Sequence, residues 1–158
     1  MLKVIIILMI LMIIISFLYQ IFVIYSTANS VSVAVQDTAL SVAAANKPNI
    51  YESLREGNTA ASTETATVLL TADEISARLC YSLGLSQKGA ALEKVESGSI
   101  LYTIKNLTVT PKNMLSREKE VTLTFVIEFE LEIPIAAYWN FGSISIPMQI
   151  ISKYTSKF

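Results

Sequence analysis

The sequence predicts an α+β fold in which a long N-terminal helix packs on a small antiparallel β-sheet. Three observations carry this prediction. An uninterrupted apolar run fills residues 4–25, a helical stripe of small residues follows over residues 26–46, and apolar and polar residues alternate strictly over residues 121–133. Because helical periodicity comes first and strand periodicity last, the pattern favours α+β over an alternating α/β fold.

The apolar run is long enough to cross a membrane as a helix. Its 22 residues contain no charge, and Ser16 and Gln20 are its strongly polar side chains. At about 1.5 Å of rise per residue it spans a hydrocarbon core of about 30 Å. Lys3 is the only charged side chain before Asp37. The positive-inside tendency therefore predicts a single-pass membrane protein with a short cytoplasmic N-terminus and its C-terminus outside.

A cleaved secretory signal is the alternative interpretation of the same run. Ser26, Thr27 and Ala28 have the small-x-small pattern of a cleavage site. The apolar core of a signal peptide is about 7–15 residues long, and this run is longer. The length therefore favours a retained anchor over residues 1–25.

A second helical segment, residues 26–47, extends the anchor. No Pro or Gly interrupts it before Pro48, so we expect one continuous helix of about 44 residues. Such a helix has so little charge that we expect it to be covered rather than to stand in water. Two partners remain open: the chain's own domain, or the same helix in neighbouring copies, since small residues allow close approach. The residues expected to serve helix packing and assembly form the small-residue stripe: Val31, Val35, Thr38, Val42 and Ala45, with Ala28 at its start.

Residues 48–98 are expected to be helical and loop structure. We predict a short helical turn over residues 50–56 and a loop after it. Thr71 and Glu74 have the spacing of a capping box, which marks the start of a helix that Gly84 would end. Residues 85–97 are expected to add a further turn of helix. The predicted helix places Ile75, Leu79, Cys80 and Leu83 on one face.

Residues 99–158 are expected to form the antiparallel sheet. A first strand over residues 99–110 would end at Pro111, with a turn over residues 111–118. The strand over residues 121–133 has one apolar face, and Pro147 indicates that the last strand lies at an edge of the sheet. The apolar face comprises Val121, Leu123, Phe125, Ile127, Phe129, Leu131 and Ile133, and the aromatic connection that follows includes Tyr138, Trp139 and Phe141.

The composition argues against catalysis and against nucleic-acid binding. The chain has no histidine, which removes the commonest general base and metal ligand, and Cys80 is its only cysteine. Outside residues 1–25 it carries 11 basic and 13 acidic residues, so no basic surface stands out. The row of Glu128, Glu130 and Glu132 could act as acid and base or bind calcium, but a solvated sheet face is the interpretation we favour. We expect no enzyme, no cofactor, no metal and no small-molecule substrate.

The layout resembles that of type IV pilins and pseudopilins, and within that group it looks most like the TadE-like pseudopilins and related small membrane proteins of Gram-positive conjugative elements. The Ala-rich stretch at residues 38–45 resembles the segment that follows their anchor, and residues 142–158 resemble their C-terminal hairpin and polar tail. Two features depart from the pilin pattern. The fifth residue is Ile5, where mature pilins usually carry Glu, and no Gly-ended basic leader is visible.

The resemblance implies a structural subunit of an extracellular filament, with N-terminal helices packed into the filament core. Its expected partners are copies of itself and, before assembly, membrane lipid. The alternative is a singly anchored extracytoplasmic scaffold of a secretion or conjugation machine that does not polymerise.

Overall fold

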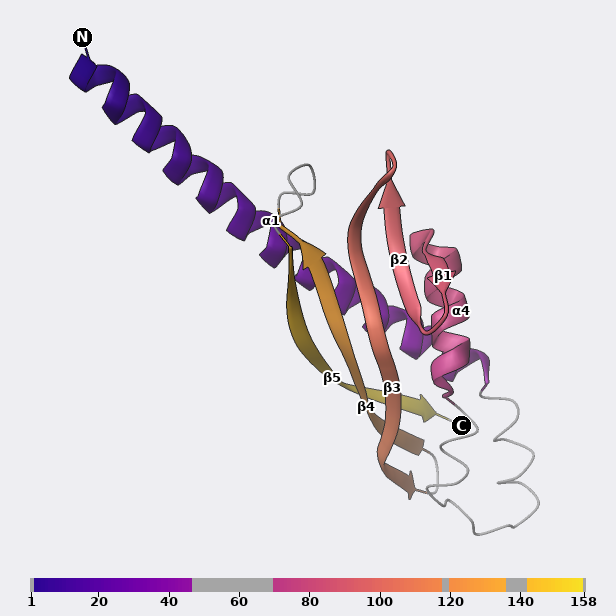
Figure 1. The fold of residues 1–158 in the computed structure, drawn as a ribbon. Coiled ribbons are helices and arrows are strands. Elements are labelled where there is room, and N and C mark those ends of the chain that lie inside the picture. The colour runs from indigo at the N-terminus through magenta and orange to yellow at the C-terminus, as the bar shows by residue number, and fades with distance from the viewer. Residues whose placement is uncertain (1, 47–69, 118–119, 136–141, 158) are drawn as a thin grey trace.

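A computed structural model describes residues 2–46, 70–117, 120–135 and 142–157 (Figure 1). It confirms the α+β class, with two described helices and one five-stranded sheet. The turn predicted over residues 50–56 and the aromatic connection lie outside the described residues. In chain order the elements are α1 (Leu2–Ala45), α4 (Ala72–Leu83), β1 (Ser86–Lys88), β2 (Ala91–Glu96), β3 (Ser99–Arg117), β4 (Glu120–Pro134) and β5 (Ser143–Lys157).

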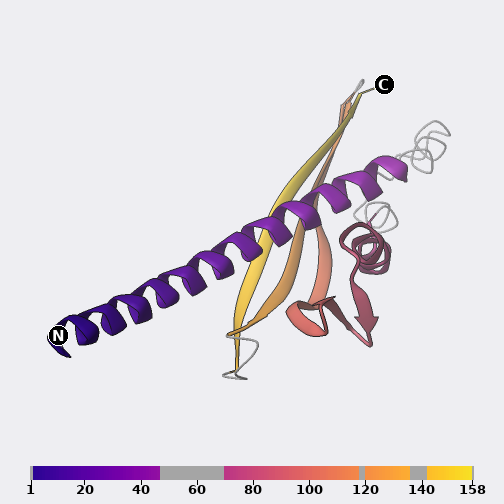
Figure 2. The same ribbon diagram turned by 90° about the horizontal axis from the view of Figure 1, so that it is seen from above.

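The molecule has two layers, a sheet and a pair of helices on one of its faces. The strands follow each other as a meander in the order β1-β2-β3-β4-β5, and every neighbouring pair is antiparallel. The second half of α1 contacts β5, while α4 contacts α1, β2 and β3 (Figure 2). Most of the first half of α1 extends beyond the domain. One hydrophobic core therefore lies between the helices and the sheet.

The α1 helix is continuous for 44 residues, as its sequence predicts. It contains neither Pro nor Gly, the two residues that most disfavour a helix interior. At about 1.5 Å per residue it is about 65 Å long, roughly twice the thickness of a hydrocarbon core. The fold therefore divides this helix between two environments.

The predicted start and end of α4 are confirmed, but of the capping box only the Thr71 contact is present, because the Glu74 carboxylate accepts a hydrogen bond from Asn46 Nδ2 at 3.0 Å. The backbone N–H of Glu74 donates to Thr71 Oγ1 at 3.3 Å, which satisfies one of the free donors at the helix start. Gly84 ends the helix with φ of 60°, a left-handed conformation that glycine adopts at low cost. Ile75 and Leu79 are fully buried and hold α4 against the core.

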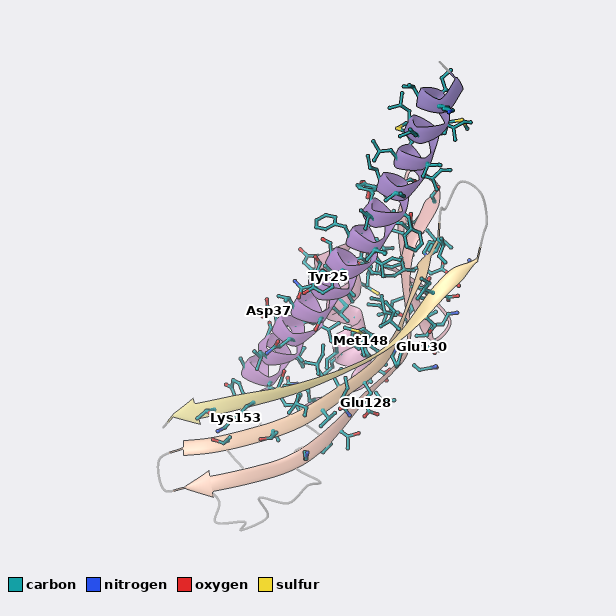
Figure 3. All side chains as sticks on the ribbon, turned by 90° about the vertical axis from the view of Figure 1, so that its left-hand side faces the viewer. Tyr25, Asp37, Glu128, Glu130, Met148 and Lys153 are labelled. Atoms are coloured by element: carbon teal, nitrogen blue, oxygen red, sulfur yellow. The ribbon has the colours of Figure 1, made fainter. Side chains whose placement is uncertain are left out.

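The alternation predicted for β4 is confirmed along the part of the strand whose side chains are described. Leu123, Phe125, Ile127, Phe129, Leu131 and Ile133 are all buried and belong to the core. Figure 3 shows Met148 of β5 on the same side of the sheet, facing α1, and Glu128 and Glu130 on the opposite side. The edge position predicted for the strand with Pro147 is also confirmed, because β5 pairs with β4 alone.

Two local expectations are wrong. The segment over residues 85–97 is not helical, because it forms β1 and β2, and the sheet therefore begins at Ser86 rather than at residue 99. Residues 97 and 98 connect β2 to β3 as a two-residue hairpin, and both have positive φ, 52° for Ser97 and 79° for Gly98. That conformation matches the right-handed twist of the paired strands.

The strand β3 also does not stop at Pro111, and residues 111–117 are strand rather than turn. The register with β4 shifts between Pro111 and Asn113, so the proline lies at a bulge. On its other side, β3 pairs with β2 only up to Ile104. The missing N–H of Pro111 is tolerated because the ladder with β4 is already irregular there and β2, the described neighbour on the other side, ends its pairing before that point.

Candidate functional site

The most unusual surface of the molecule is the first half of α1. From Val4 to Phe22 its large apolar side chains are 48–70% exposed. We call residues 3–22 the bare half of α1. Soluble monomers rarely expose continuous apolar patches beyond a few hundred Å². A partner outside this chain must therefore cover the bare half.

Lipid is one candidate for that partner. Among the described residues, α1 is the one helix long and apolar enough to cross a membrane, and its most apolar stretch buries nothing inside the domain. A membrane anchor and a signal sequence share that property. Side-chain exposure along α1 falls gradually beyond the bare half, because Val23 and Ile24 are half-buried and Ile24 packs against the core.

The second half of α1 contributes the small-residue stripe to the chain's own core. Val31, Val35, Thr38 and Val42 are all buried, and Val35 is completely inaccessible. The core cluster joins the three valines to apolar side chains of α4 and the sheet. These four side chains are therefore already covered, and of the two partners that the sequence left open they contact the domain.

The fifth residue of the stripe, Ala45, is exposed. Ala39 and Ala43, which the sequence reasoning did not include, are buried instead. A seven-residue repeat drifts by about 20° per two turns on a helix of 3.6 residues per turn. The drift rotates Ala45 towards the border of the contact, and Ala39 and Ala43 complete the buried face on its other side. Only the three-dimensional position of the sheet decides where that face is centred.

The opposite face of the second half of α1 is polar although it is almost uncharged. Ser26, Asn29, Ser30, Gln36 and Asp37 are exposed there, and Asp37 projects away from the sheet in Figure 3. The hydroxyl and amide groups of this face can form hydrogen bonds with water. Val33 lies on the same exposed face and is 49% exposed, so the expectation that this part of the helix is covered by a partner stays a prediction.

A groove of about 610 Å³ lies where α1 leaves the domain. The helix forms one wall with residues from Tyr19 to Val31, and the ends of β3 and β4 form the other. Tyr102 is buried at this groove, and its burial raises the pKa of the phenol above its ordinary value. The wall opposite the helix comprises Leu83, Ile100, Leu101, Tyr102, Ile133 and Pro134. The groove is thus a mainly apolar junction between the end of the bare half and the domain.

The acidic row on β4, Glu128, Glu130 and Glu132, forms hydrogen bonds and an ion pair with side chains of both neighbouring strands, β3 and β5. Glu132 forms an ion pair with Lys105 of β3 and accepts a hydrogen bond from the Ser143 hydroxyl of β5. These contacts, with Lys105 first, hold the pKa of the Glu132 carboxyl below its ordinary value. Gln149 Nε2 donates to Glu128 Oε1 at 2.7 Å. The row therefore links the three strands across the wet face of the sheet.

Glu130, in the middle of that row, accepts hydrogen bonds from Asn106 and from Ser145. Among the described residues, no three acidic or cysteine side chains are grouped closely enough to hold a metal ion. Cys80 is a half-buried free thiol that packs against the core. Within the described ranges the acidic row is engaged in cross-strand bonds, so we take the bare half and its junction as the candidate functional site.

The architecture is pilin-like, because a long apolar N-terminal helix emerges from an antiparallel sheet domain that covers only its second half. Comparison with protein-family models, with curated proteins and with solved structures finds no match for this chain.

Proposed function

We propose that this chain is a pilin-like structural subunit, held in the membrane by α1 until the bare halves of several copies pack together as the core of an extracellular filament. One observation carries the proposal: α1 is bare in its first half and built into the domain in its second. A helix apolar all round belongs either in lipid or inside a larger assembly.

Retention of the anchor is supported by the packing beyond it. A cut after Ala28 would pass through the middle of a continuous helix. It would also remove Ile24 and Ala28, both of which pack against the core. A signal peptide has no reason to supply core residues to the mature domain, so the proposal keeps α1 whole.

The orientation follows from charge. Lys3 is the only charged side chain ahead of Asp37, so the positive-inside rule places the N-terminus in the cytoplasm and the sheet outside. Protease added to cells stripped of their wall should remove a tag fused after Phe158. A protected tag would exclude this orientation.

A second function is favoured by a different observation. Most of the small-residue stripe is buried inside the domain, and the outer face of the second half of α1 carries mainly polar side chains. An anchored scaffold of a secretion or conjugation machine, with its bare half permanently in lipid, has the same requirements. The proposal contains no catalytic step in either case, in keeping with the absence of histidine from the chain.

Electron microscopy separates the two functions. Cells producing the chain should release filaments when sheared, and antibodies against the domain should label them along their length. A strain producing the chain with Leu11→Glu is the matched control, because a carboxylate in the bare half is costly in lipid and between apolar helices alike. If the wild-type chain stays with the membrane fraction and no labelled filament is found, the scaffold is the correct function.

A further inference from the structure

Exposed apolar side chains collect at one end of the sheet. Outside α1, most of the large apolar residues that the domain leaves exposed lie at the β2–β3 hairpin and at the start of β5. We call this set the junction rim: Val95, Ile100, Leu101 and Ile144. Each of the four is 37–45% exposed. In a domain that otherwise buries its apolar face, this concentration at one end requires an explanation.

The junction rim lies at the level where α1 leaves the domain. Ile100 and Leu101 line the groove together with α1 residues from Tyr19 to Val31. Val95 pairs with Ile100, and Ile144 pairs with Ile133, which lines the same groove. Figure 1 shows the β2–β3 hairpin and the adjoining ends of β4 and β5 on the side towards which the bare half extends.

The length of the anchor places this level at a membrane surface. A span of about 20 residues that begins near Val4 ends near Val23. The residues of α1 that share the groove with the junction rim begin at Tyr19 and continue past that point. Tyr19 and Tyr25 are 67% and 73% exposed, and tyrosine is enriched at the headgroup level of membranes.

The charge around the junction rim suits the same location. The described rim segments, residues 95–102, 133–135 and 142–145, contain one charged side chain, Glu96, and beside them Glu132, which accepts a hydrogen bond from Ser143, is neutralised by its ion pair with Lys105. The far end of the sheet differs, because Lys112, Arg117, Glu120, Lys153 and Lys157 all lie in its strands. A surface that reaches the boundary between headgroups and acyl chains presents apolar side chains there, and its charged side chains stay among the headgroups or in water. Only the end next to the anchor satisfies this condition.

We infer that the junction rim rests in the headgroup layer of the bilayer that anchors α1, with Ile100 and Leu101 among the acyl chains nearest the surface. The inference rests on the proposed membrane anchor and adds a second contact between domain and lipid. Two contacts fix the orientation of the sheet on the membrane, which a single helix leaves free to rotate. Because the contact is apolar, it should not depend on anionic lipid or on salt.

Fluorescence quenching by lipids tests the inference with the full chain in phosphatidylcholine vesicles. In a Cys80→Ser background, single cysteines carry an environment-sensitive dye at Ile14 of the bare half, at Leu101 of the rim, or at Ile151, which is 58% exposed. Ile151 is the matched control, since it lies well along β5 from the rim. Circular dichroism checks that each labelled chain keeps its fold.

The expected result is a graded one. Spin labels near the lipid headgroup should quench the dye at Leu101 strongly, spin labels near the chain ends should quench the dye at Ile14 strongly, and neither should quench Ile151. Raising the salt concentration or diluting the protein in lipid should leave the Leu101 signal unchanged.

Three other outcomes overturn the inference and can be told apart. If Ile14 is quenched while Leu101 is not, the anchor stands and the rim does not touch lipid. If the dye at Leu101 is shielded only at high protein density, a second copy of the chain covers the rim. If Ile14 itself escapes quenching, the membrane anchor fails, and the rim contact fails with it.

Discussion

Lys94 of β2 donates a hydrogen bond from Nζ to the carbonyl oxygen of Leu83, the last residue of α4, at 2.6 Å. Carbonyl groups at the C-terminus of a helix lack partners within the helix, and a cation there is favoured by the helix dipole. The contact fixes the end of α4 to the sheet at the wall of the groove, since Leu83 also lines the junction.

We predict that Lys94→Met lowers the free energy of unfolding by about 1.5–3 kcal/mol, because a charged hydrogen bond to a partly buried carbonyl is lost. Thermal unfolding followed by circular dichroism in mild detergent measures the change. Lys88→Met is the matched control. Its ammonium group lies 3.5 Å from Glu93 at a mostly exposed position, so its loss should cost no more than about 0.5 kcal/mol. Equal effects of the two substitutions would show that the Lys94 hydrogen bond stabilises the fold no more than an exposed ion pair does.

The two faces of α1 should respond oppositely to the same substitution. Val35 is completely buried against the domain, and Val33 is 49% exposed on the same helix. Val35→Lys should prevent folding, because it places an ammonium group in an apolar core without a partner. Val33→Lys should leave the fold and the melting temperature almost unchanged. Protease resistance of the membrane-bound chain distinguishes the variants, and a resistant Val35→Lys chain would show that the stripe does not belong to the core.

The ion pair between Lys105 and Glu132 should make a small part of the stability depend on pH. The pKa of Glu132 is lower in the folded chain than its ordinary value, so the unfolded chain binds a proton more readily. The contribution is therefore present above the ordinary glutamate range and lost as the pH falls through the lowered pKa. Glu132→Gln should remove this acid-side loss. Lys105→Met should remove the larger part of it, because the hydrogen bond from Ser143 remains, and the double variant should remove no more than Glu132→Gln alone. An undiminished loss in both single variants would place its origin elsewhere.

Ser152 is 2% exposed, and its Oγ has no hydrogen-bond partner among the described residues. A buried hydroxyl without a partner costs free energy of about 1–3 kcal/mol relative to water. Ser152→Ala should therefore be neutral or raise the free energy of unfolding by up to about 1 kcal/mol. Ser143→Ala is the comparison, since it removes a hydroxyl that donates to Glu132. A clear loss of stability in Ser152→Ala would contradict this prediction, because it would show that the Ser152 hydroxyl forms a hydrogen bond in the folded chain.

Elements with a strong local signal could be predicted from the sequence. The unbroken apolar and small-residue run gave α1, the Thr71–Glu74 capping box gave α4, and strict alternation gave the buried face of β4. In each case the signal is local: the spacing of apolar residues indicates which face is buried, and the capping residues mark where the helix begins.

The strands β1 and β2 were missed because their signal is weak. β1 has three residues, all exposed, and in β2 only Leu92 is buried. The useful signal was Ser97–Gly98, a dipeptide typical of a tight turn between strands. The prediction that the strand ends at Pro111 was wrong, because the bulge that accommodates this proline in β3 is set by pairing with β4 rather than by local sequence.

The sequence alone locates the candidate site, but it does not show which residues of α1 pack on the domain and which stay exposed. The bare half followed from its composition. Whether Val31, Val35, Thr38 and Val42 serve the domain or other copies depends on where the sheet lies, and a stripe of small residues is compatible with both. The junction rim was also invisible, because β2, β3 and β5 contribute to it from separate parts of the chain.

The most direct test of this division of α1 is oxidative cross-linking of single cysteines in cells, in a Cys80→Ser background. Ile14 in the bare half is 50% exposed, and Val35 is inaccessible within the domain. Cysteines in the bare half, including Ile14→Cys, should form disulfide-linked dimers between copies, and Val35→Cys should form none. Dimers linked through position 35 in a folded chain, or a bare half that never cross-links, would contradict the account.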